Sequence, residues 1–357
     1  MATISSNDAI EIVIGSHSFH PTFTYPIYGE NELIYGYDDL NIRIEYDPVS
    51  LLPLVEMTYS GKPAADCDDP LKTLLGFMPK NTYTDREKWE AARKHEFSEP
   101  PGTTVFEINS KFLVRKGKVD EMVGFLERFR TFVLFFIEAG SFIDQDDYRW
   151  DIYVLIEAKS KAFAGFVTVY PYFYYSTAEE FEKSREMLVK KRISQFVVLP
   201  PYQHRGVGVQ LYTGLIKEFQ TDDRVKQITV EDPNEAFDVL RDRADLSIFA
   251  QDPDWATLSL PLDSDLVAKI TKKSKLIARQ VRRCLEIAML EKYDNEPMQY
   301  RKLVKERLFE HNYEGLKDLD EGTQAIMLRD VYSKVVEDYR KYLNDTVEPA
   351  PKRQKAA

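Results

Sequence analysis

The pattern of hydrophobic and polar positions divides the chain into three parts, and the first is rich in short strands. Apolar residues run or alternate over residues 10–14 and 42–46, which predicts β-strands there. Residues 61–101 are rich in Pro, Asp and Lys, with one helical pattern near residues 85–95. We therefore expect a small β-rich N-terminal domain over residues 1–100.

The middle part mixes both periodicities. Residues 104–112 predict a strand, and apolar side chains recur at helical spacing over residues 119–139. Strands at 151–158 and 164–175, joined by a polar Lys-Ser-Lys turn, predict a hairpin. A strand from Ile193, a glycine-bearing turn, a helix and a strand at 227–230 follow. This order predicts an α/β (α+β) domain over residues 101–262.

The last part reads as helical throughout. Helical patterns cover residues 265–292, 296–310 and 321–343, so we expect a C-terminal helical domain over residues 263–345. Residues 346–357 are polar with Pro and Lys, which predicts a disordered tail.

Composition narrows the class of protein. The chain has 357 residues, of which 43% are apolar and 30% charged, as in soluble globular proteins. No window of about 20 apolar residues predicts a membrane span, and the N-terminus lacks the pattern of a secretory signal. The net charge of −11 argues against direct nucleic-acid binding and suits a basic partner. Cys67 and Cys284 have no metal-ligand spacing, so we expect no metal and a reducing compartment.

The most informative stretch is a strand that runs into a glycine turn and then a helix. Phe196, Val197 and Val198 are followed by two prolines and by Gln203, His204, Arg205, Gly206, Val207, Gly208 and Val209. The first N–H groups of a helix have no internal partner, and the helix dipole adds positive charge there, so such a turn suits a pyrophosphate. An ordinary strand-to-helix turn is the alternative.

A second motif follows the helix. Glu231, Asp232, Pro233 and Asn234 come directly after the strand at 227–230. A carboxylate held at the end of a strand can act as a general base, and Glu231 is a candidate for that role. Alternatively, the motif only turns the chain and caps a helix, since Asp and Asn do both well.

These motifs resemble one family. The Gln-x-x-Gly-x-Gly turn at 203–208 resembles the acetyl-CoA signature of GNAT acetyltransferases. The run from Phe196 to Asp242, with the Phe-Ile-Glu-Ala-Gly-Ser stretch around Glu138, resembles the catalytic subunits of type B histone acetyltransferases, in a fungal-like form. The resemblance runs from about Tyr25 to Asp245 and weakens beyond it.

The resemblance implies a GNAT core with a mixed, splayed sheet and direct transfer of acetyl from acetyl-CoA to lysine. It makes Glu231 the general base, with Glu138 and Asp232 as the other catalytic carboxylates. Neither cysteine lies in a reactive context, so a covalent acetyl-enzyme is not expected. The pantetheine arm of acetyl-CoA is expected to pair with the backbone of residues 196–198.

The implied cofactor residues extend beyond the strand and the turn. Asn234, Phe237 and Arg243 match family positions near acetyl-CoA. His204 lies inside the glycine turn, where its imidazole could be mistaken for a catalytic base. The resemblance implies that only its backbone contacts the cofactor and that its side chain faces solvent. Arg205 is a candidate for a phosphate contact, and an exposed arginine on a turn is the alternative.

The resemblance also implies where the substrate binds. The residues expected to hold the histone tail are Glu30, Asn31, Glu32, Trp150, Tyr170, Pro171 and Tyr172. Tyr170, Tyr172 and Tyr174 share one strand face, and a half-buried aromatic face is the alternative. Trp150 is alternatively a core residue. The basic stretch at 269–283 is expected to be a solvated face, with a phosphate or partner contact as the lesser alternative.

The resemblance implies a chromatin enzyme, with a place in DNA repair, that acetylates the tail of free histone H-4 alongside its histone partner. It also implies a WD-repeat β-propeller histone chaperone as the second subunit, and cytoplasm and nucleus as the locations. No nucleic acid or membrane is expected as a direct partner. The alternatives are a GNAT enzyme for another protein or a polyamine, and a histone-binding module without catalysis.

Overall fold

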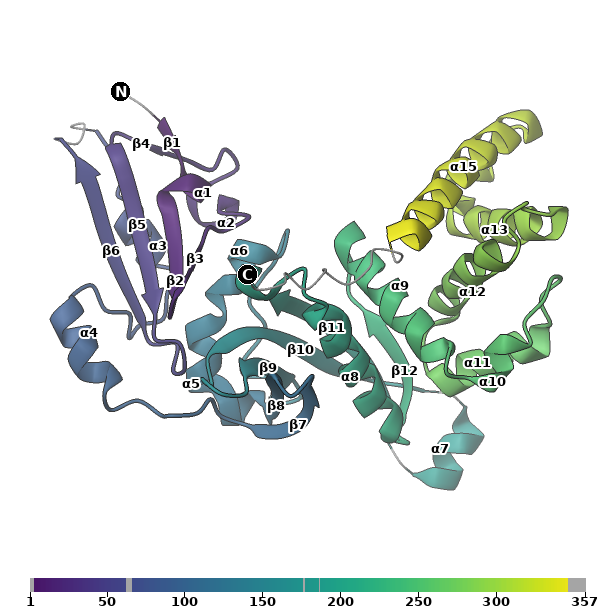
Figure 1. Cartoon of the computed structure of the whole chain (residues 1–357), viewed down its shortest axis with the longest axis horizontal. Coiled ribbons are helices and arrows are strands. Elements are labelled where there is room, and N and C mark those ends of the chain that lie inside the picture. Colours follow the sequence, from purple (N-terminus) through teal and green to yellow (C-terminus); the bar gives the residue numbers. More distant parts are fainter. Residues whose placement is uncertain (1–2, 62–65, 176, 186, 346–357) are drawn as a thin grey trace, which may run out of the picture. The chain divides into compact units, whose positions relative to one another are not determined.

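The structure, a computed structural model, describes residues 3–61, 66–175, 177–185 and 187–345 (Figure 1). It divides into two compact units, residues 1–218 and 219–357, and the division falls inside helix α8 (Val207–Thr221). The predicted domain boundaries at residues 100, 262 and 345 stay predictions. The predicted disordered tail, residues 346–357, lies outside the described residues.

The N-terminal part of the first unit is built on a four-stranded sheet in the order β3-β2-β5-β6. Its strands are β2 (Ile10–Ile14), β3 (His17–Phe19), β5 (Asp38–Tyr46) and β6 (Pro53–Ser60). Strands β2 and β5 pair in parallel, and the other pairs are antiparallel. The strands predicted at 10–14 and 42–46 are therefore confirmed. Ile10, Ile12, Ile42 and Ile44 are fully buried, which explains why this sheet forms.

Shorter elements surround this sheet. They are β1 (Thr3–Ser5), α1 (Ser6–Ala9), α2 (Tyr25–Tyr28), β4 (Leu33–Tyr35), α3 (Pro70–Leu75) and α4 (Arg86–Arg93). The helix predicted near 85–95 is confirmed as α4. Trp89 on this helix is 1% exposed and its indole Nε1 donates to the Leu52 carbonyl at 3.0 Å, so α4 is held against the sheet.

A larger antiparallel sheet follows, with five strands of this unit in the order β11-β10-β9-β8-β7. They are β7 (Thr103–Ile108), β8 (Phe112–Lys118), β9 (Asp151–Glu157), β10 (Phe163–Phe173) and β11 (Val189–Val198). The hairpin predicted from the Lys-Ser-Lys turn is confirmed as β9–β10, although β10 ends at Phe173 instead of residue 175.

The prediction of one strand over residues 104–112 was wrong. Asn109 and Ser110 both have positive φ, +51° and +54°, and the Lys111 N–H donates to the Ile108 carbonyl at 2.9 Å. Asparagine tolerates the left-handed region better than most residues, so a tight turn forms there and separates β7 from β8.

The helix predicted over residues 119–139 is also shorter than expected. Helix α5 (Val119–Phe129) is followed by α6 (Thr131–Phe136), and Ile137 is already extended with φ −117° and ψ 118°. A Cβ added at Gly140 would lie 2.8 Å from the Val133 carbonyl oxygen, so the chain turns back tightly against α6. Glu138 therefore lies beyond the helix end, in the loop before β9, and not on the helix itself.

The rest of the first unit and the second unit are mostly helical. Further elements are α7 (Ala178–Ser184), η1 (Pro200–Tyr202), β12 (Val225–Val230), α9 (Glu235–Phe249), α10 (Pro253–Ala256), α11 (Ser264–Ser274), α12 (Ala278–Lys292), α13 (Met298–His311), α14 (Tyr313–Leu316) and α15 (Glu321–Asp345). The helices predicted at 296–310 and 321–343 are confirmed as α13 and α15. The order helix, hairpin, strand, helix, strand is confirmed too, so the fold is mixed α/β.

The prediction of one helix over residues 265–292 was wrong. Helix α11 ends at Ser274, Lys275 has the left-handed φ of +59°, and α12 begins at Ala278. Within the second unit, a buried polar group joins α12, α13 and α15: Arg307 pairs with Glu286 at 2.6 Å, and the Tyr339 hydroxyl donates to Glu286 at 3.0 Å. In the described part of the chain, no helix has the length and apolar content to cross a membrane.

Candidate active site

The glycine turn has the geometry that the sequence predicted. Strand β11 ends at Val198, and an exposed turn at 203–206 leads into α8. Gln203 Nε2 donates back to the Val198 carbonyl at 2.7 Å, which closes the turn. The Gln210 N–H donates to the Gly206 carbonyl at 3.1 Å, so the preceding N–H groups, those of residues 206–209, have no partner inside the helix. Those groups and the helix dipole can bind an anion.

Gly206 is needed in this turn for its backbone angle. Its φ is +73°, where a side chain is strained, whereas an added Cβ would meet only Gln210 Nε2 at an ordinary 3.6 Å. His204 has φ +55° and an exposed side chain, in agreement with the expectation that it faces solvent. Arg205 is exposed as well.

A second glycine, which the sequence analysis missed, lies beside the strand that leads to the turn. A Cβ at Gly165 on β10 would come within 2.3 Å of the Val197 carbonyl oxygen on β11. Only glycine allows this approach, so Gly165 sets the path of residues 196–198. Pairing of these residues with a pantetheine arm stays a prediction.

The loop that carries Glu138 is held by residues far away in the sequence. The Ala139 N–H donates to the Tyr25 hydroxyl, and the Phe23 N–H donates to the Phe135 carbonyl at 3.0 Å. On another side, Gln195 Nε2 of β11 donates to the Ser141 carbonyl at 2.7 Å. Glu138 itself is exposed. Tyr25 and Gln195 carried no signal in the sequence because their partners are distant backbone groups.

The structure separates the two acidic residues predicted for the loop at 30–32. Glu30 and Asn31 are exposed, whereas the Glu32 carboxylate accepts from the N–H groups of Thr24 at 2.6 Å and Tyr25 at 3.0 Å. Burial raises the pKa of Glu32, but these backbone hydrogen bonds and the side-chain hydrogen bonds from Asn7 and Thr24 outweigh it and hold the pKa below its usual value. Glu32 therefore stabilises the start of α2, next to the tyrosine that supports the Glu138 loop.

The aromatic residues predicted to hold a substrate form one cluster, the aromatic platform of Trp150, Tyr170 and Tyr172. The ring centroids of Trp150 and Tyr170 lie 4.8 Å apart, and those of Tyr170 and Tyr172 lie 4.7 Å apart. The prediction that Tyr170 and Tyr172 share a face is confirmed. Tyr174 lies beyond the end of β10, and Pro171 pairs with Lys191 of β11.

Charged side chains of the chain surround this platform. The Tyr170 hydroxyl donates to Asp147 at 2.7 Å, and Arg149 pairs with Asp147 at 2.6 Å while lying 4.9 Å from the Tyr170 ring. Hydrogen bonds from Arg149 and Tyr170 hold the pKa of Asp147 well below its usual value. Lys190 and Arg192 lie over the Tyr172 ring at 5.2 and 4.7 Å.

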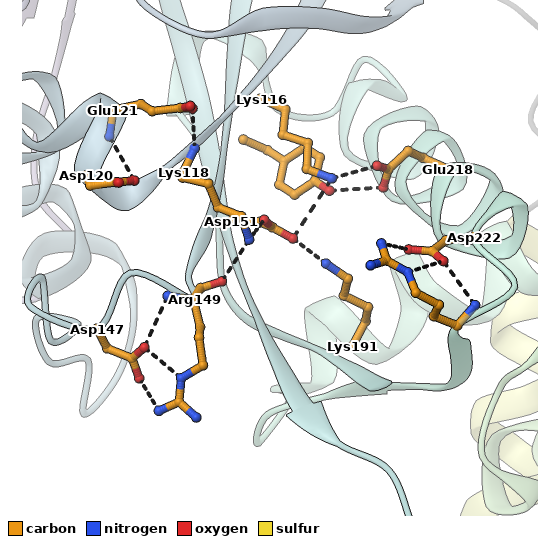
Figure 2. A network of polar contacts seen from close by, with 12 residues as sticks. Lys116, Lys118, Asp120, Glu121, Asp147, Arg149, Asp151, Lys191, Glu218 and Asp222 are labelled. Atoms are coloured by element: carbon orange, nitrogen blue, oxygen red, sulfur yellow. Dashed lines mark hydrogen bonds and ion pairs between the residues drawn. The ribbon is translucent and has the colours of Figure 1, made fainter. Parts of the chain in front are cut away.

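Asp151, the residue after Trp150, is the centre of a network of charges that the sequence analysis missed (Figure 2). Asp151 is 1% exposed, yet it contacts Lys118 at 2.6 Å, Lys116 at 3.9 Å and the buried Lys191. Burial raises the pKa of Asp151, but the neighbouring lysines outweigh it and hold the pKa below its usual value.

The network reaches in two directions. Lys118 Nζ also donates to the Arg149 carbonyl at 3.2 Å, next to Trp150 of the platform. Lys116 pairs with Glu218 of α8 at 2.8 Å, and the Tyr153 hydroxyl donates to the same carboxylate at 2.9 Å. The Asp151 network therefore connects the loop at Arg149 with α8, the helix that follows the glycine turn (Figure 2).

In the second unit, Glu231 follows directly after β12 and is exposed. Asp232 is exposed too and has a positive φ of +32°. Asn234 caps α9, because its Oδ1 accepts from the Phe237 N–H at 2.9 Å. The interpretation that this motif turns the chain and caps a helix is thus confirmed, and it leaves the Glu231 side chain outside the cap.

The remaining predicted cofactor residue, Arg243, lies on α9 with its guanidinium 5.5 Å from the Tyr342 ring of α15. Both residues line a cavity of about 450 Å³. A role of Asn234, Phe237 and Arg243 in cofactor binding stays a prediction. Among the described residues, no group of three or more His, Cys, Asp or Glu could hold a metal ion.

The comparisons with known proteins agree with these motifs. Residues 2–138 match the family model of the histone acetyl transferase N-terminus. Over 96% of this chain, the chain is 35% identical to the histone acetyltransferase type B catalytic subunit of Kluyveromyces lactis and 37% identical to that of Debaryomyces hansenii, covering 92% and 90% of those proteins. The Schizosaccharomyces pombe protein of the same name is 33% identical over 99% of this chain and 97% of its own length.

The chain belongs to the family of type B histone acetyltransferase catalytic subunits. The matched regions cover 96% to 99% of the chain and therefore extend into both units. The resemblance found in the sequence is confirmed, and the chain is an acetyltransferase.

Proposed function

We propose that this enzyme transfers acetyl from acetyl-CoA directly to the ε-amine of lysines in the N-terminal tail of free, newly made histone H-4. The observation that carries the proposal is the similarity to type B catalytic subunits over 96% of the chain. The proposed mechanism uses residues of the glycine turn, the aromatic platform and the end of β12.

Acetyl-CoA is the co-substrate, and it supplies the acetyl thioester. The N–H groups of residues 206–209 fit its pyrophosphate, since they have no partner inside the helix and lie at the positive end of a 15-residue helix. Gly206 provides the left-handed backbone angle of the turn that leads into α8. The side chains of His204 and Arg205 are exposed and leave the turn open to a ligand.

Glu231 is the proposed general base. The substrate amine, with an unperturbed pKa of ~10.4, is protonated at neutral pH and cannot attack until a carboxylate accepts its proton. Glu231 is an exposed carboxylate at a strand end, where the flanking strand and the capped α9 restrict its backbone. Glu138 and Asp232 are also exposed, and we assign them assisting roles in holding the substrate lysine.

The tail-binding side is proposed at the aromatic platform and the exposed Glu30 and Asn31. Tyrosine and tryptophan rings can pack against the aliphatic stem of a lysine while its amine stays polar. The acidic character of the whole chain, with net charge −11, favours a basic tail over nucleic acid. A WD-repeat β-propeller histone chaperone is the proposed second subunit, and cytoplasm and nucleus are the proposed locations.

The test is to incubate the enzyme with radiolabelled acetyl-CoA and each core histone separately, with nucleosomes and spermidine in parallel. The proposal predicts label on free histone H-4, confined to its tail, and little on nucleosomes. Label mainly on spermidine or another protein would replace the substrate assignment. Binding of histone H-4 without any acetyl transfer would indicate a histone-binding module instead.

A further inference from the structure

The sequence predicts one continuous helix where the structure has a break between α11 and α12. Lys275 in this break contacts the end of α8 and the strand β12. Lys275 takes a left-handed conformation with φ +59°, a region that side chains other than glycine and asparagine rarely adopt. A lysine held there needs compensating contacts. Its side chain and its backbone both supply them.

The Lys275 side chain binds the end of α8. Its Nζ donates to the Gln220 carbonyl at 2.8 Å and to the Asp222 carbonyl at 2.9 Å. In return, Gln220 Nε2 donates to the Ser274 carbonyl at 3.0 Å. The last carbonyls of a helix lack internal partners and lie at the negative end of its dipole, so an ammonium group is favourable there.

The Lys275 backbone binds the strand that ends at Glu231. The Ile228 N–H of β12 donates to the Lys275 carbonyl at 2.7 Å, and Ile228 forms a parallel β-bridge with Leu276. Ile228 is 0% exposed and Leu276 is 4% exposed, so this contact is fully buried. Glu231 lies only three residues further along the chain.

Other cations of the basic stretch at 269–283 pair with carboxylates instead of backbone carbonyls. Lys269 pairs with Asp254 at 2.7 Å, Lys273 pairs with Asp252 at 2.7 Å, and Arg282 pairs with Glu310 at 2.6 Å. These are ion pairs of exposed cations, as expected for a solvated face. Lys275 contacts backbone carbonyls of α8 and the backbone of β12 instead.

We propose that Lys275 is a positioning residue for Glu231. Lys275 connects the C-terminal end of α8 to β12, the strand that precedes Glu231. These contacts fix the distance between the end of α8 and β12. This inference rests on the proposed role of Glu231 as general base. A small shift of a base can cost a large factor in rate, since proton transfer needs hydrogen-bond reach.

The experiment compares three variants of the full chain at one position with one control. Lys275→Gly removes the ammonium group but accepts the left-handed angle, so the turn and the Lys275 carbonyl contact are kept. Lys275→Arg keeps donors for the two carbonyls, and Lys275→Met removes them while keeping the stem. Lys273→Met is the matched control, because it removes a cation two residues away, on α11, whose ammonium group pairs with Asp252 instead of the two carbonyls at the end of α8.

We expect kcat on a histone H-4 tail peptide to fall by about tenfold in Lys275→Gly and Lys275→Met, and to stay within about twofold of the parent in Lys273→Met. Lys275→Arg should recover most of the loss. Raising the pH should narrow the gap between Lys275→Gly and the parent, because more substrate amine is then already neutral. The acetyl-CoA dissociation constant, measured by calorimetry, should stay unchanged.

A folded Lys275→Gly enzyme with parental kcat and pH profile would overturn the inference. So would a loss of activity that only follows the fraction of unfolded protein, because a purely structural role predicts that. Glu231→Gln is measured alongside. If Glu231→Gln keeps parental kcat, the proposed base fails and the positioning role fails with it. If Glu231→Gln loses activity and Lys275→Gly does not, only the positioning role fails.

Discussion

The two carboxylates Glu138 and Glu231 lie in regions that are built in different ways. Glu138 lies in a loop whose position depends on Tyr25, more than 100 residues earlier, and on Gln195, more than 50 residues later. Glu231 lies between a strand and a helix that are adjacent in the sequence, and Asn234 caps that helix. The Glu138 loop is assembled from distant parts, whereas the cap beside Glu231 is local and its strand has a distant contact with Lys275. The proposed roles, Glu231 as base and Glu138 as the assisting group, can therefore be tested separately.

The largest expected effect tests this division of roles. Glu231→Gln keeps size and most hydrogen bonding but cannot accept the ammonium proton, so we expect kcat to fall by ~10²–10⁴-fold with little change in acetyl-CoA binding. Glu138→Gln should cost less. Steady-state kinetics on a histone H-4 tail peptide measure both. Near-parental kcat for Glu231→Gln would remove it as base, and Glu138 or Asp232 would take its place.

Protein stability provides the next test, because the unit that contains Glu138 also contains the Asp151 network. Asp151→Asn leaves the buried Lys191 without its carboxylate, and breaking a buried pair typically costs about 3–5 kcal/mol. Urea unfolding followed by circular dichroism measures this. Glu99→Gln is the control, since Glu99 also pairs with two cations, Arg115 and Lys161, but is exposed and should cost less than about 1 kcal/mol.

The pH dependence of stability should follow from the same carboxylate. The folded pKa of Asp151 is lowered, so its stabilising contribution is fully present above the unfolded pKa of ~3.9 and is lost as pH falls through the folded value. The gap in unfolding free energy between parent and Asp151→Asn should therefore shrink in acid. An equal gap at pH 7 and in acid would contradict the assignment of the charge to Asp151.

A smaller effect is expected at the glycine turn. Gly206→Ala places a Cβ at φ +73°, which costs about 1–2 kcal/mol in backbone strain, and we expect acetyl-CoA affinity to fall about tenfold. Gly124→Ala is the control, because a Cβ at Gly124 on α5 meets nothing within 4 Å. Calorimetry measures the acetyl-CoA affinity of both variants. If folded Gly206→Ala binds acetyl-CoA as tightly as the parent does, the glycine turn is not the pyrophosphate site.

The smallest effect is expected at Glu30. Exposed ion pairs are worth only ~0.2–1 kcal/mol, so Glu30→Gln should raise the peptide KM modestly, and only at low salt. Glu32→Gln should act differently, because its carboxylate accepts from the Thr24 and Tyr25 N–H groups. We expect Glu32→Gln to lower stability and kcat together. Equal peptide KM for Glu30→Gln and the parent at low salt would place the tail elsewhere.

What the sequence could predict follows the same contrast between local and distant contacts. Local sequence determines the glycine turn at 203–208, the strand before it and the Asn234 cap. Their patterns can therefore be recognised in the sequence. The early end of α6 at Phe136 and the break at Lys275 depend on tertiary contacts that override helical periodicity.

The same holds for individual side chains. Glu32 and Asp151 have no local motif, since their partners lie between 7 and 40 residues away in the sequence. The turn at Asn109 is the exception, because its Asn-Ser pair is a local signal for a break that the apolar pattern concealed. Sequence therefore predicted the glycine turn and the Asn234 cap well, and predicted the supports of the Glu138 loop poorly.

The most direct test of the account is the pH–rate profile of Glu231→Gln beside that of Glu138→Gln. If Glu231 accepts the lysine proton, raising the pH supplies neutral amine and narrows the gap between Glu231→Gln and the parent. Glu138→Gln should keep a profile parallel to that of the parent, because Glu231 still accepts the proton there. Rescue of Glu138→Gln by high pH, with a parallel profile for Glu231→Gln, would contradict the account and make Glu138 the base.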